Sequence, residues 1–335
     1  MSGAPLRIVA IGGGTGLSVL LRGLKKHVRH AGAAAQRQPE VEVTAVVTVT
    51  DDGGSSGRLR RELDVLPPGD IRNCMVALSE DEGLLSRLFQ YRFARGRGLK
   101  GHSFGNLFLT ALTDLTGDFV KAVTLSSEVL ASRGRIFPCT SANVVLEARL
   151  TNGKLVSGET RISRSRSSIA EVVLQPRRCK PMRETLQAIE RADLICLGPG
   201  SLFTSVIPNL LVSGIPRAIM KSKAHKAYFL NLMWQPGETM EFTASDHIEA
   251  LYRHSMPGLL DTIVVNTRPL TAEMRRRYAR ERVLAVNVDR AELEEMGLQV
   301  AGHDLLEKGL KVRHNPRAAA DVAVMLAESS RRGLP

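Results

Sequence analysis

The segment from Val43 to Asn73 constrains the fold of this chain more than any other. It opens as a β-branched run with almost no polar interruption before Thr48, which is typical of a strand buried on both faces of a parallel sheet. The adjacent carboxylates Asp51 and Asp52 follow this strand. They are costly to hold together unless a cation, hydrogen-bond donors or water takes up their charge. The segment therefore predicts an α/β fold with a functional site at a strand end.

The small residues behind these carboxylates can bring N–H groups and hydroxyls together around an anion or a metal-bound phosphate. They are Gly53, Gly54, Ser55, Ser56 and Gly57. Pro67-Pro68-Gly69-Asp70 then supplies a third carboxylate on a stiff turn before an apolar helix. A solvated acidic turn that caps a helix is the alternative. Two such turns around one segment favour a ligand site.

A second unit of this kind lies at the start of the chain. Leu6 to Ile11 is predicted to be a buried strand, and Leu17 to Leu24 an amphipathic helix. The turn between them consists of Gly12, Gly13, Gly14, Thr15 and Gly16. Strand, glycine turn and helix form the phosphate-binding unit of nucleotide-binding sheets. The strict dinucleotide fingerprint fails, because Leu17 stands where its last glycine is required. An ordinary tight turn without a ligand is the alternative for residues 12–16. The segment from His27 to Gln38, after the helix, is predicted to be a surface loop.

Small polar residues also precede the predicted helix from Leu107 to Leu115. Ser103 and Asn106 lie in this turn and are candidates for a second anion or sugar contact. An ordinary helix cap explains the same residues equally well. His102 has no obvious carboxylate partner in the sequence, which argues against Ser/His catalysis.

The pattern changes between residues 135 and 175. Asn143 to Leu150 alternates, Asn152-Gly153 favours a hairpin turn, and Ile169 to Leu174 adds a strand. We expect a small antiparallel β element inserted into one α/β domain that spans residues 1–335. The basic segment 161–168 is expected to form an exposed, mobile loop.

The second half returns to the α/β pattern. The predicted strand from Asp193 to Leu197 ends in a further glycine turn, formed by Gly198, Pro199, Gly200 and Ser201. Because the ends of parallel strands share one edge, we expect this turn, the Gly12 turn and the Asp51 turn to face one crevice.

More strands are predicted at residues 227–230, 262–265, 283–286 and 310–313. Asn231 follows the first of them in a polar stretch. Arg313 lies at the last strand-to-helix junction, before a helix that starts at Asn315-Pro316, and is well placed for a phosphate. A surface residue beside a helix cap is the alternative.

Composition narrows the classes of function. The net charge of +12 suits an anionic partner, yet the basic residues are scattered and aromatic residues make up only 4%. Without a nucleic-acid motif, an anionic small ligand is favoured over nucleic acid. The four cysteines form no CxxC pair. No signal-peptide or membrane-spanning segment is recognised, so we expect a cytoplasmic protein without membrane insertion.

Long motifs in one order resemble a known family. They read IGGGTGLSVLLRGL, TDDGGSSGRLR, PPGDIRN, GHSFGNL, GPGSLFTSVIPNLL and QPGET. Together they resemble the YvcK family of bacterial gluconeogenesis factors, in the superfamily of CofD, the 2-phospho-L-lactate transferase. The resemblance implies a Rossmann-like α/β fold with a mostly parallel sheet. It also implies a role in cell shape and wall synthesis during gluconeogenic growth, and binding of a UDP-sugar such as UDP-N-acetylglucosamine.

Two classes of function stay open at this point. The first is a nucleotide-sugar-binding regulator that acts through an unknown protein partner. The second is a magnesium-dependent transferase, since the resemblance implies that Asp51, Asp52 and Asp70 match the metal and substrate carboxylates of CofD-like enzymes. The transferases continue with Ser-Asn-Pro where this chain reads Gly-Ser-Leu. An NAD-dependent dehydrogenase is a distant third, and a homo-oligomer is left open.

The predicted site combines all these motifs. Its ligand-binding residues are Gly12, Gly13, Gly14, Thr15, Gly16, Asp52, Gly53, Gly54, Ser55, Ser56, Asn73, Ser103, Asn106, Gly198, Pro199, Gly200, Ser201, Asn231 and Arg313. Asp51 and Asp70 are its candidate magnesium ligands.

Overall fold

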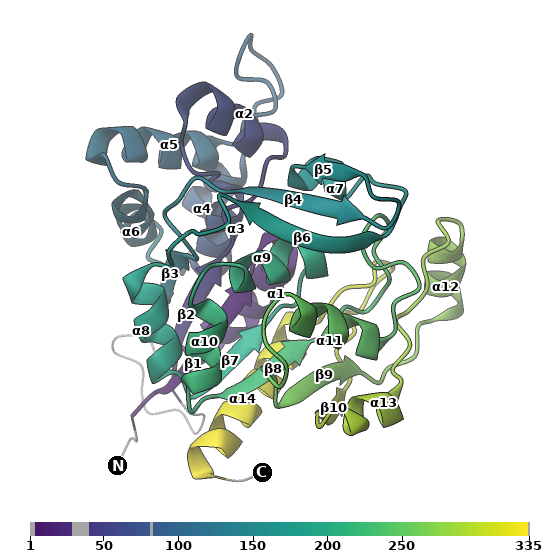
Figure 1. The fold of residues 1–335 in the computed structure, drawn as a ribbon. Coiled ribbons are helices and arrows are strands. Elements are labelled where there is room, and N and C mark those ends of the chain that lie inside the picture. Colours follow the sequence, from purple (N-terminus) through teal and green to yellow (C-terminus); the bar gives the residue numbers. More distant parts are fainter. Residues whose placement is uncertain (1–3, 29–39, 81–82, 334–335) are drawn as a thin grey trace.

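A seven-stranded parallel sheet forms the centre of the computed structural model, which describes residues 4–28, 40–80 and 83–333 (Figure 1). Its strands are β1 (Leu6–Gly12), β2 (Val41–Val47), β3 (Arg135–Pro138), β7 (Leu194–Leu197), β8 (His225–Phe229), β9 (Thr262–Asn266) and β10 (Gln299–His303). They lie in the order β10-β9-β8-β7-β1-β2-β3. Strands are added outward from β1 in both directions, so the switch point of the topology falls between β1 and β7, where open α/β sheets bind ligands.

The central strands owe their place to their apolar sequence. Ile8 of β1 pairs with Val43 of β2 on one side and with Leu194 of β7 on the other. All three side chains are buried. A strand covered on both faces must be apolar on both faces, as the near-continuous hydrophobic runs of β1 and β7 are.

Helices cover the two faces of this sheet and extend to one side of it (Figure 1). They are α1 (Gly14–Leu24), α2 (Gly54–Leu63), α3 (Gly69–Leu78), α4 (Leu84–Gln90), α5 (Phe104–Thr116), α6 (Phe119–Val129), α8 (Arg183–Arg191), α9 (Ile207–Leu210), α10 (Ile215–Lys221), α11 (Ala244–Arg253), α12 (Ala272–Ala279), α13 (Arg290–Glu295) and α14 (Pro316–Arg332), with the short helices η1 (Lys25–His27) and η2 (Leu202–Val206). To one side of the sheet, α2, α4 and α5 pack on one another and on α3. Helix α1 packs between α3 and α14. A Cβ on Gly23 would lie 1.9 Å from the Pro316 carbonyl oxygen, so only glycine permits this close approach of α1 and α14. The predicted Rossmann-like α/β fold is confirmed.

A smaller sheet stands over one side of the molecule, as Figure 1 shows in teal. It has the antiparallel order β5-β4-β6 and consists of β4 (Val145–Leu150), β5 (Leu155–Ser157) and β6 (Ile169–Gln175). Its first strand begins at Val145 and not at residue 135. Residues 135–138 instead form β3, which pairs in parallel with β2 as an edge strand of the main sheet.

Two predicted strands are wrong. Residues 283–286 and 310–313 form no strand, and only isolated bridges join Met233 to Ala285 and Leu306 to His314. Their apolar residues are partly exposed at Leu284 and Leu310, so these segments lie on the surface and not in the sheet. The edge strand after β9 is β10, whose Gly-containing sequence lacked a clear strand pattern.

Two predicted loops also differ from the structure. The glycine-serine segment after Asp52 begins helix α2 at Gly54. The basic segment 161–168 starts inside a helical turn, α7 (Glu159–Ile162), where Ile162 is fully buried while the arginines on either side are exposed. From residue 29 onward, the predicted surface loop His27–Gln38 lies outside the described residues.

Within the described ranges, no single helix is long and apolar enough to cross a membrane, although the bent pair Leu202–Leu210 and Ile215–Lys221 passes by length and composition together. The four cysteines are buried and unbridged.

Candidate ligand-binding site

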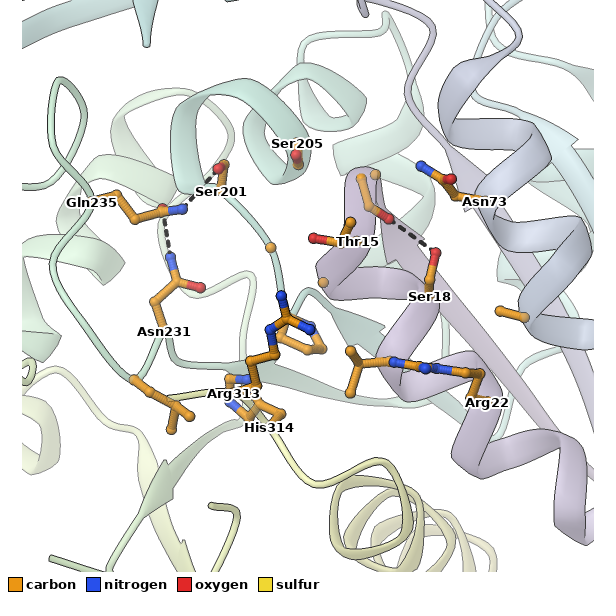
Figure 2. Close-up of a pocket in the computed structure, with 18 of the residues that line it drawn as sticks. Thr15, Ser18, Arg22, Asn73, Ser201, Ser205, Asn231, Gln235, Arg313 and His314 are labelled. Carbon is orange, nitrogen blue, oxygen red and sulfur yellow. Dashed lines mark hydrogen bonds between the residues drawn. The ribbon is translucent and has the colours of Figure 1, made fainter. Parts of the chain in front are cut away.

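A cavity of about 760 Å³ lies at the switch point between β1 and β7. Figure 2 shows polar side chains reaching it from both halves of the sheet. Its walls are Gly13, Gly14, Thr15, Gly16, Ser18, Val19, Arg22, Arg72, Asn73, Val76, Ala77, Gln90, Arg92, Glu159, Pro199, Gly200, Ser201, Ser205, Asn231, Leu232, Met233, Trp234, Gln235, Val312, Arg313 and His314. The predicted Gly12 and Gly198 turns therefore contribute to one cavity, whereas no residue of the Asp51 turn, predicted to face the same crevice, lines it.

The first wall is the turn from β1 into α1. Gly14 has a left-handed φ of +61°, which favours glycine. A Cβ on Gly16 would lie 2.5 Å from the Pro199 carbonyl oxygen and 2.7 Å from the Gly200 Cα. The turns after β1 and β7 are thus in direct backbone contact, and a side chain at Gly16 would separate them.

The second wall follows β7 and β8. The Gln235 amide donates to the Ser201 hydroxyl at 2.8 Å, and the Asn231 amide donates to the Gln235 carbonyl oxygen at 2.9 Å (Figure 2). This chain of hydrogen bonds fixes the three side chains relative to one another. It offers amide and hydroxyl groups to a polar ligand across from Thr15.

The charge of the cavity is positive. Arg22, Arg72, Arg92 and Arg313 line it, whereas Glu159 is the one carboxyl group among its described lining residues. Burial, followed by the neighbouring Asp70 and Asp51, raises the pKa of Glu159 well above its usual range and favours the neutral acid. An anion is therefore the ligand that this electrostatic field favours.

The basic side chains are not equivalent. Burial, with a contribution from Arg92, lowers the pKa of Arg72 to about 10, so its guanidinium stays charged at neutral pH. It donates to the Asn73 side chain at 2.7 Å, and its Nε is buried without a partner among the described residues. Burial lowers the pKa of His314 to about 4, so this imidazole is neutral and donates from Nε2 to the Leu230 carbonyl oxygen at 3.1 Å. Arg313 reaches into the gap between the Ser201 and Thr15 walls in Figure 2.

The acidic turn after β2 is arranged differently. None of Asp51, Asp52 and Asp70 lines the cavity. The Asp52 carboxylate accepts hydrogen bonds from the Thr160 backbone N–H at 2.8 Å and from the Thr160 hydroxyl at 2.7 Å. These hydrogen bonds hold the start of α7, and with it Glu159, against the turn after β2.

Asp70 supports the glycine turn from behind. It is 8% exposed, accepts a hydrogen bond from the Gly14 N–H, and has its pKa raised to about 7 by burial and by the charge of Asp51. Burial also raises the pKa of Asp51, which accepts from the Gly53 N–H at 2.8 Å and from the Ser56 hydroxyl. The Gly14 N–H therefore binds Asp70, which sequence reasoning had not anticipated.

A metal must be judged against this arrangement. Across residues 4–28, 40–80 and 83–333, no three His, Cys, Asp or Glu side chains are placed to hold an ion. The charge of Asp51 nonetheless adds to burial in raising the pKa of Asp70, and the charge of Asp52 adds to burial in raising that of Asp51, so a cation would relieve repulsion here. Mg²⁺ commonly takes one or two carboxylates and completes its shell with water and substrate phosphates. The pair fits such a partial site.

The predicted residues on α2 and α5 form an internal network. The Ser55 hydroxyl shares a hydrogen bond with His102 Nδ1 at 3.0 Å, and the Asn106 amide donates to the Ser56 hydroxyl at 3.3 Å. Ser103 caps α5 by accepting from the Asn106 backbone N–H. The cap interpretation of Ser103 agrees with this geometry, and these side chains join α2 to α5 behind the cavity.

The structure thus divides the predicted site into two groups. Gly13, Gly14, Thr15, Gly16, Asn73, Pro199, Gly200, Ser201, Asn231 and Arg313 line the cavity. Gly12, Asp51, Asp52, Gly53, Gly54, Ser55, Ser56, Asp70, Ser103, Asn106 and Gly198 do not. Sequence reasoning missed Arg22, Arg72, Arg92 and Gln235. Arg22 lies two turns along the helix after the glycine turn, and this spacing could have pointed to it. Arg72 directly precedes Asn73 and Gln235 lies four residues after Asn231, but packing decides whether these side chains and Arg92 reach the cavity.

The fold and this cavity define the class: a Rossmann-like α/β protein with a cationic ligand cavity at its switch point. Comparison with known proteins gives the family. The family model "2-phospho-L-lactate transferase CofD" matches residues 8–306. The gluconeogenesis factor of Halalkalibacterium halodurans is 47% identical over 309 residues and covers 92% of each chain. That of Bacillus subtilis is 47% identical over 321 residues, 96% of this chain and 98% of the relative.

Solved structures agree with this result. A crystal structure of a Bacillus halodurans protein matches with a TM-score of 0.90 and 46% identity, over 96% of this chain and 100% of the other. The chain belongs to the CofD family, and within it to the gluconeogenesis factors.

Proposed function

We propose that this gluconeogenesis factor is a cytoplasmic regulator that binds a nucleotide sugar of the UDP-N-acetylglucosamine type. Through a protein partner, the bound form would support cell shape and wall synthesis during growth on gluconeogenic carbon sources. The proposal makes no claim of catalysis.

The positive cavity carries this proposal. A nucleotide sugar presents a diphosphate, and the cavity offers helix α1 with its glycine turn, together with four arginines against one carboxyl group of raised pKa. Its volume of about 760 Å³ falls in the range of small-molecule sites. Trp234 supplies an aromatic face for a base, and Ser201, Asn231 and Gln235 supply polar groups for a sugar.

Calorimetry tests the ligand class. UDP-N-acetylglucosamine, UDP-glucose, GDP and NAD are titrated into the same protein preparation. We expect the UDP-sugars to bind, and NAD to bind far more weakly or not at all, because the dinucleotide fingerprint is broken at Leu17. Tight NAD binding without a UDP-sugar signal would overturn the proposal.

The pair Asp51 and Asp70, together with the CofD family match, favours a second candidate, a magnesium-dependent transferase of phosphorus-containing groups. Phosphoryl transfer requires mainly that a protein position the reacting groups and stabilise their charge. The glycine turn and the arginines of the cavity could serve these two purposes. Incubated with Mg²⁺, a deazaflavin alcohol and a phospholactyl-guanosine donor, the chain is expected to give no coupled product. Detection of that product by mass spectrometry would assign the transferase function.

Magnesium also has a test that does not depend on activity. Asp51 and Asp70 would hold the ion, and its charge would offset theirs beside a bound diphosphate. If they do, the UDP-sugar affinity falls when Mg²⁺ is replaced by EDTA, and this difference disappears in Asp70→Asn. An affinity that is independent of Mg²⁺ in both proteins would exclude a metal role in ligand binding.

A further inference from the structure

An exposed surface of apolar and basic side chains lies on α4 and on the segment that joins it to α5. Its apolar members are Leu84, Leu85, Leu88, Tyr91 and Leu99, and its basic members are Arg87, Arg92, Arg95, Arg97 and Lys100. We call it the α4 surface. Nothing in the cavity chemistry accounts for it, although Arg92 belongs to both.

Helix α4 is apolar on both of its faces. Phe89 is buried and its ring packs against the rings of Phe104 and Phe108, which anchors the helix to α5. Leu84, Leu88 and Tyr91 follow the spacing i, i+4 and i+7 on the other side, and Leu84 is 76% exposed. A surface helix ordinarily has polar residues on its solvent-facing side. The apolar residues on this side of α4 therefore indicate an interaction surface.

The segment 91–104, which follows α4 directly, carries a further exposed leucine, Leu99. This segment folds back on itself through hydrogen bonds from the Phe93 N–H to the His102 carbonyl and from the Gly101 N–H to the Phe93 carbonyl. The chain between Phe93 and Gly101 projects beyond α2 in Figure 1. Its sequence contains Leu99 together with Arg95, Arg97 and Lys100. A bound peptide usually lies in a groove, whereas these apolar side chains lie on a projecting segment. A flat, extended binding partner therefore fits them better than a peptide.

The charge within residues 83–113 has one sign. This range contains no Asp or Glu and five Arg and Lys residues between positions 87 and 100, whereas Glu80, Asp81 and Glu82 directly precede it in the sequence. Arg92 and Arg58 donate to backbone carbonyls of Gly101 and Lys100, and none of the five forms an ion pair within the described part of the chain. A second copy would bring like charges together, so the complementary surface is anionic.

We propose that the α4 surface docks on an anionic membrane surface. The leucines and Tyr91 enter the boundary between head groups and acyl chains, and the arginines and Lys100 contact the lipid phosphates. The contact is peripheral and requires no spanning helix. Because Arg92 and Gln90 also line the cavity, the docked molecule carries its ligand site beside the membrane.

Vesicle co-sedimentation tests this docking with the full chain. We expect binding to vesicles that mix phosphatidylglycerol with phosphatidylcholine, none to phosphatidylcholine alone, and weaker binding as salt is raised. Leu88→Glu and Leu99→Glu should each reduce the vesicle-binding constant about tenfold or more, because each removes a leucine side chain that the docked protein buries in the membrane. Arg97→Gln should reduce it about fivefold, as expected for one cation near an anionic membrane.

Matched controls separate this surface from general stickiness. Leu115→Glu changes a leucine of α5 that is 81% exposed but has Asp114 beside it, and Arg280→Gln changes the exposed cation that directly follows basic helix α12. Both should bind vesicles as wild type does, with circular dichroism confirming the fold of every variant. Equal losses in control and test variants would overturn the proposal. So would an absence of vesicle binding, including the case in which soluble poly-glutamate binds the α4 surface instead.

Discussion

Three strand-to-helix junctions of this molecule are alike in their glycine and small polar residues, but two of them line the cavity and the third does not. The turns after β1 and β7 combine glycines with polar residues, and they open onto a cavity lined by arginines. The turn after β2 has the same glycines and serines, but Asp52 is hydrogen-bonded to Thr160 and Asp70 lies behind Gly14. The comparison teaches that a glycine-rich strand end becomes a ligand wall only where the surrounding elements leave it uncovered.

The largest effect is expected at Gly16. Gly16→Ala places a Cβ 2.5 Å from the Pro199 carbonyl oxygen, which drives the β1 and β7 turns apart. We expect loss of measurable UDP-sugar binding and a decrease of about 1–3 kcal/mol in unfolding free energy. Calorimetry and urea denaturation measure the two quantities. Gly54→Ala is the corresponding change at the β2 junction, where an added Cβ meets no atom within 4 Å. The left-handed φ of +43° at Gly54 makes alanine strained there, so unfolding free energy should also fall, but ligand affinity should stay unchanged. Equal losses of ligand affinity in the two variants would erase the distinction between the junctions.

The next effect is at Arg313, the cation on the C-terminal side of the cavity. Arg313→Glu removes a charge-assisted contact worth about 1.5–3 kcal/mol and adds repulsion. UDP-sugar affinity should therefore fall more than about tenfold while the circular dichroism spectrum is kept. Arg166→Glu, an exposed arginine outside the cavity, is the matched control and should bind as wild type does. A folded Arg313→Glu protein with unchanged affinity would remove this junction from the site.

Asp52 tests whether the acidic turn is structural. Asp52→Ala removes the acceptor for the N–H and hydroxyl of Thr160, and we expect a loss of about 2 kcal/mol in unfolding free energy. Asp52→Asn, which retains an acceptor oxygen, should restore part of it. Urea denaturation measures stability, and calorimetry on the same variants measures affinity. If Asp52 contacts the ligand directly, Asp52→Ala will instead weaken binding at unchanged stability.

The last prediction concerns the pH dependence of stability. The pKa of Asp70 in the folded protein is about 7, above the ordinary value of 3.8, so between these values the folded state holds a proton that the unfolded state has released. Its contribution to stability is therefore greatest below about pH 4 and is lost as pH rises through 7. Asp70→Asn should flatten this part of the profile, as measured by urea denaturation from pH 4 to 8. An identical slope in both proteins would assign the pH dependence to other groups.

Much of the fold was predictable from local pattern. The buried strands β1, β2 and β7 are apolar on both faces, the hairpin at Asn152-Gly153 has its turn chemistry, and Asn315-Pro316 caps α14. The segments 283–286 and 310–313 failed because a short apolar run does not reveal whether its neighbours will cover it. The antiparallel element was predicted from residue 135, because strand pattern alone does not tell which sheet a strand joins.

The sequence by itself determined the Rossmann-like fold and the glycine turns at the strand ends, because both follow from local periodicity and backbone freedom. Tertiary structure decided which turns face the ligand. Arg72, Arg92 and Glu159 come from α3, the segment after α4 and α7, and their charges meet in the cavity only when those elements pack. The tertiary structure also shows that Asp52, a candidate ligand-binding residue in the sequence, makes a structural contact instead. Its hydrogen-bond donors come from Thr160, 108 residues away in the sequence. Charges and hydrogen bonds depend on the distances between groups, and the fold sets those distances.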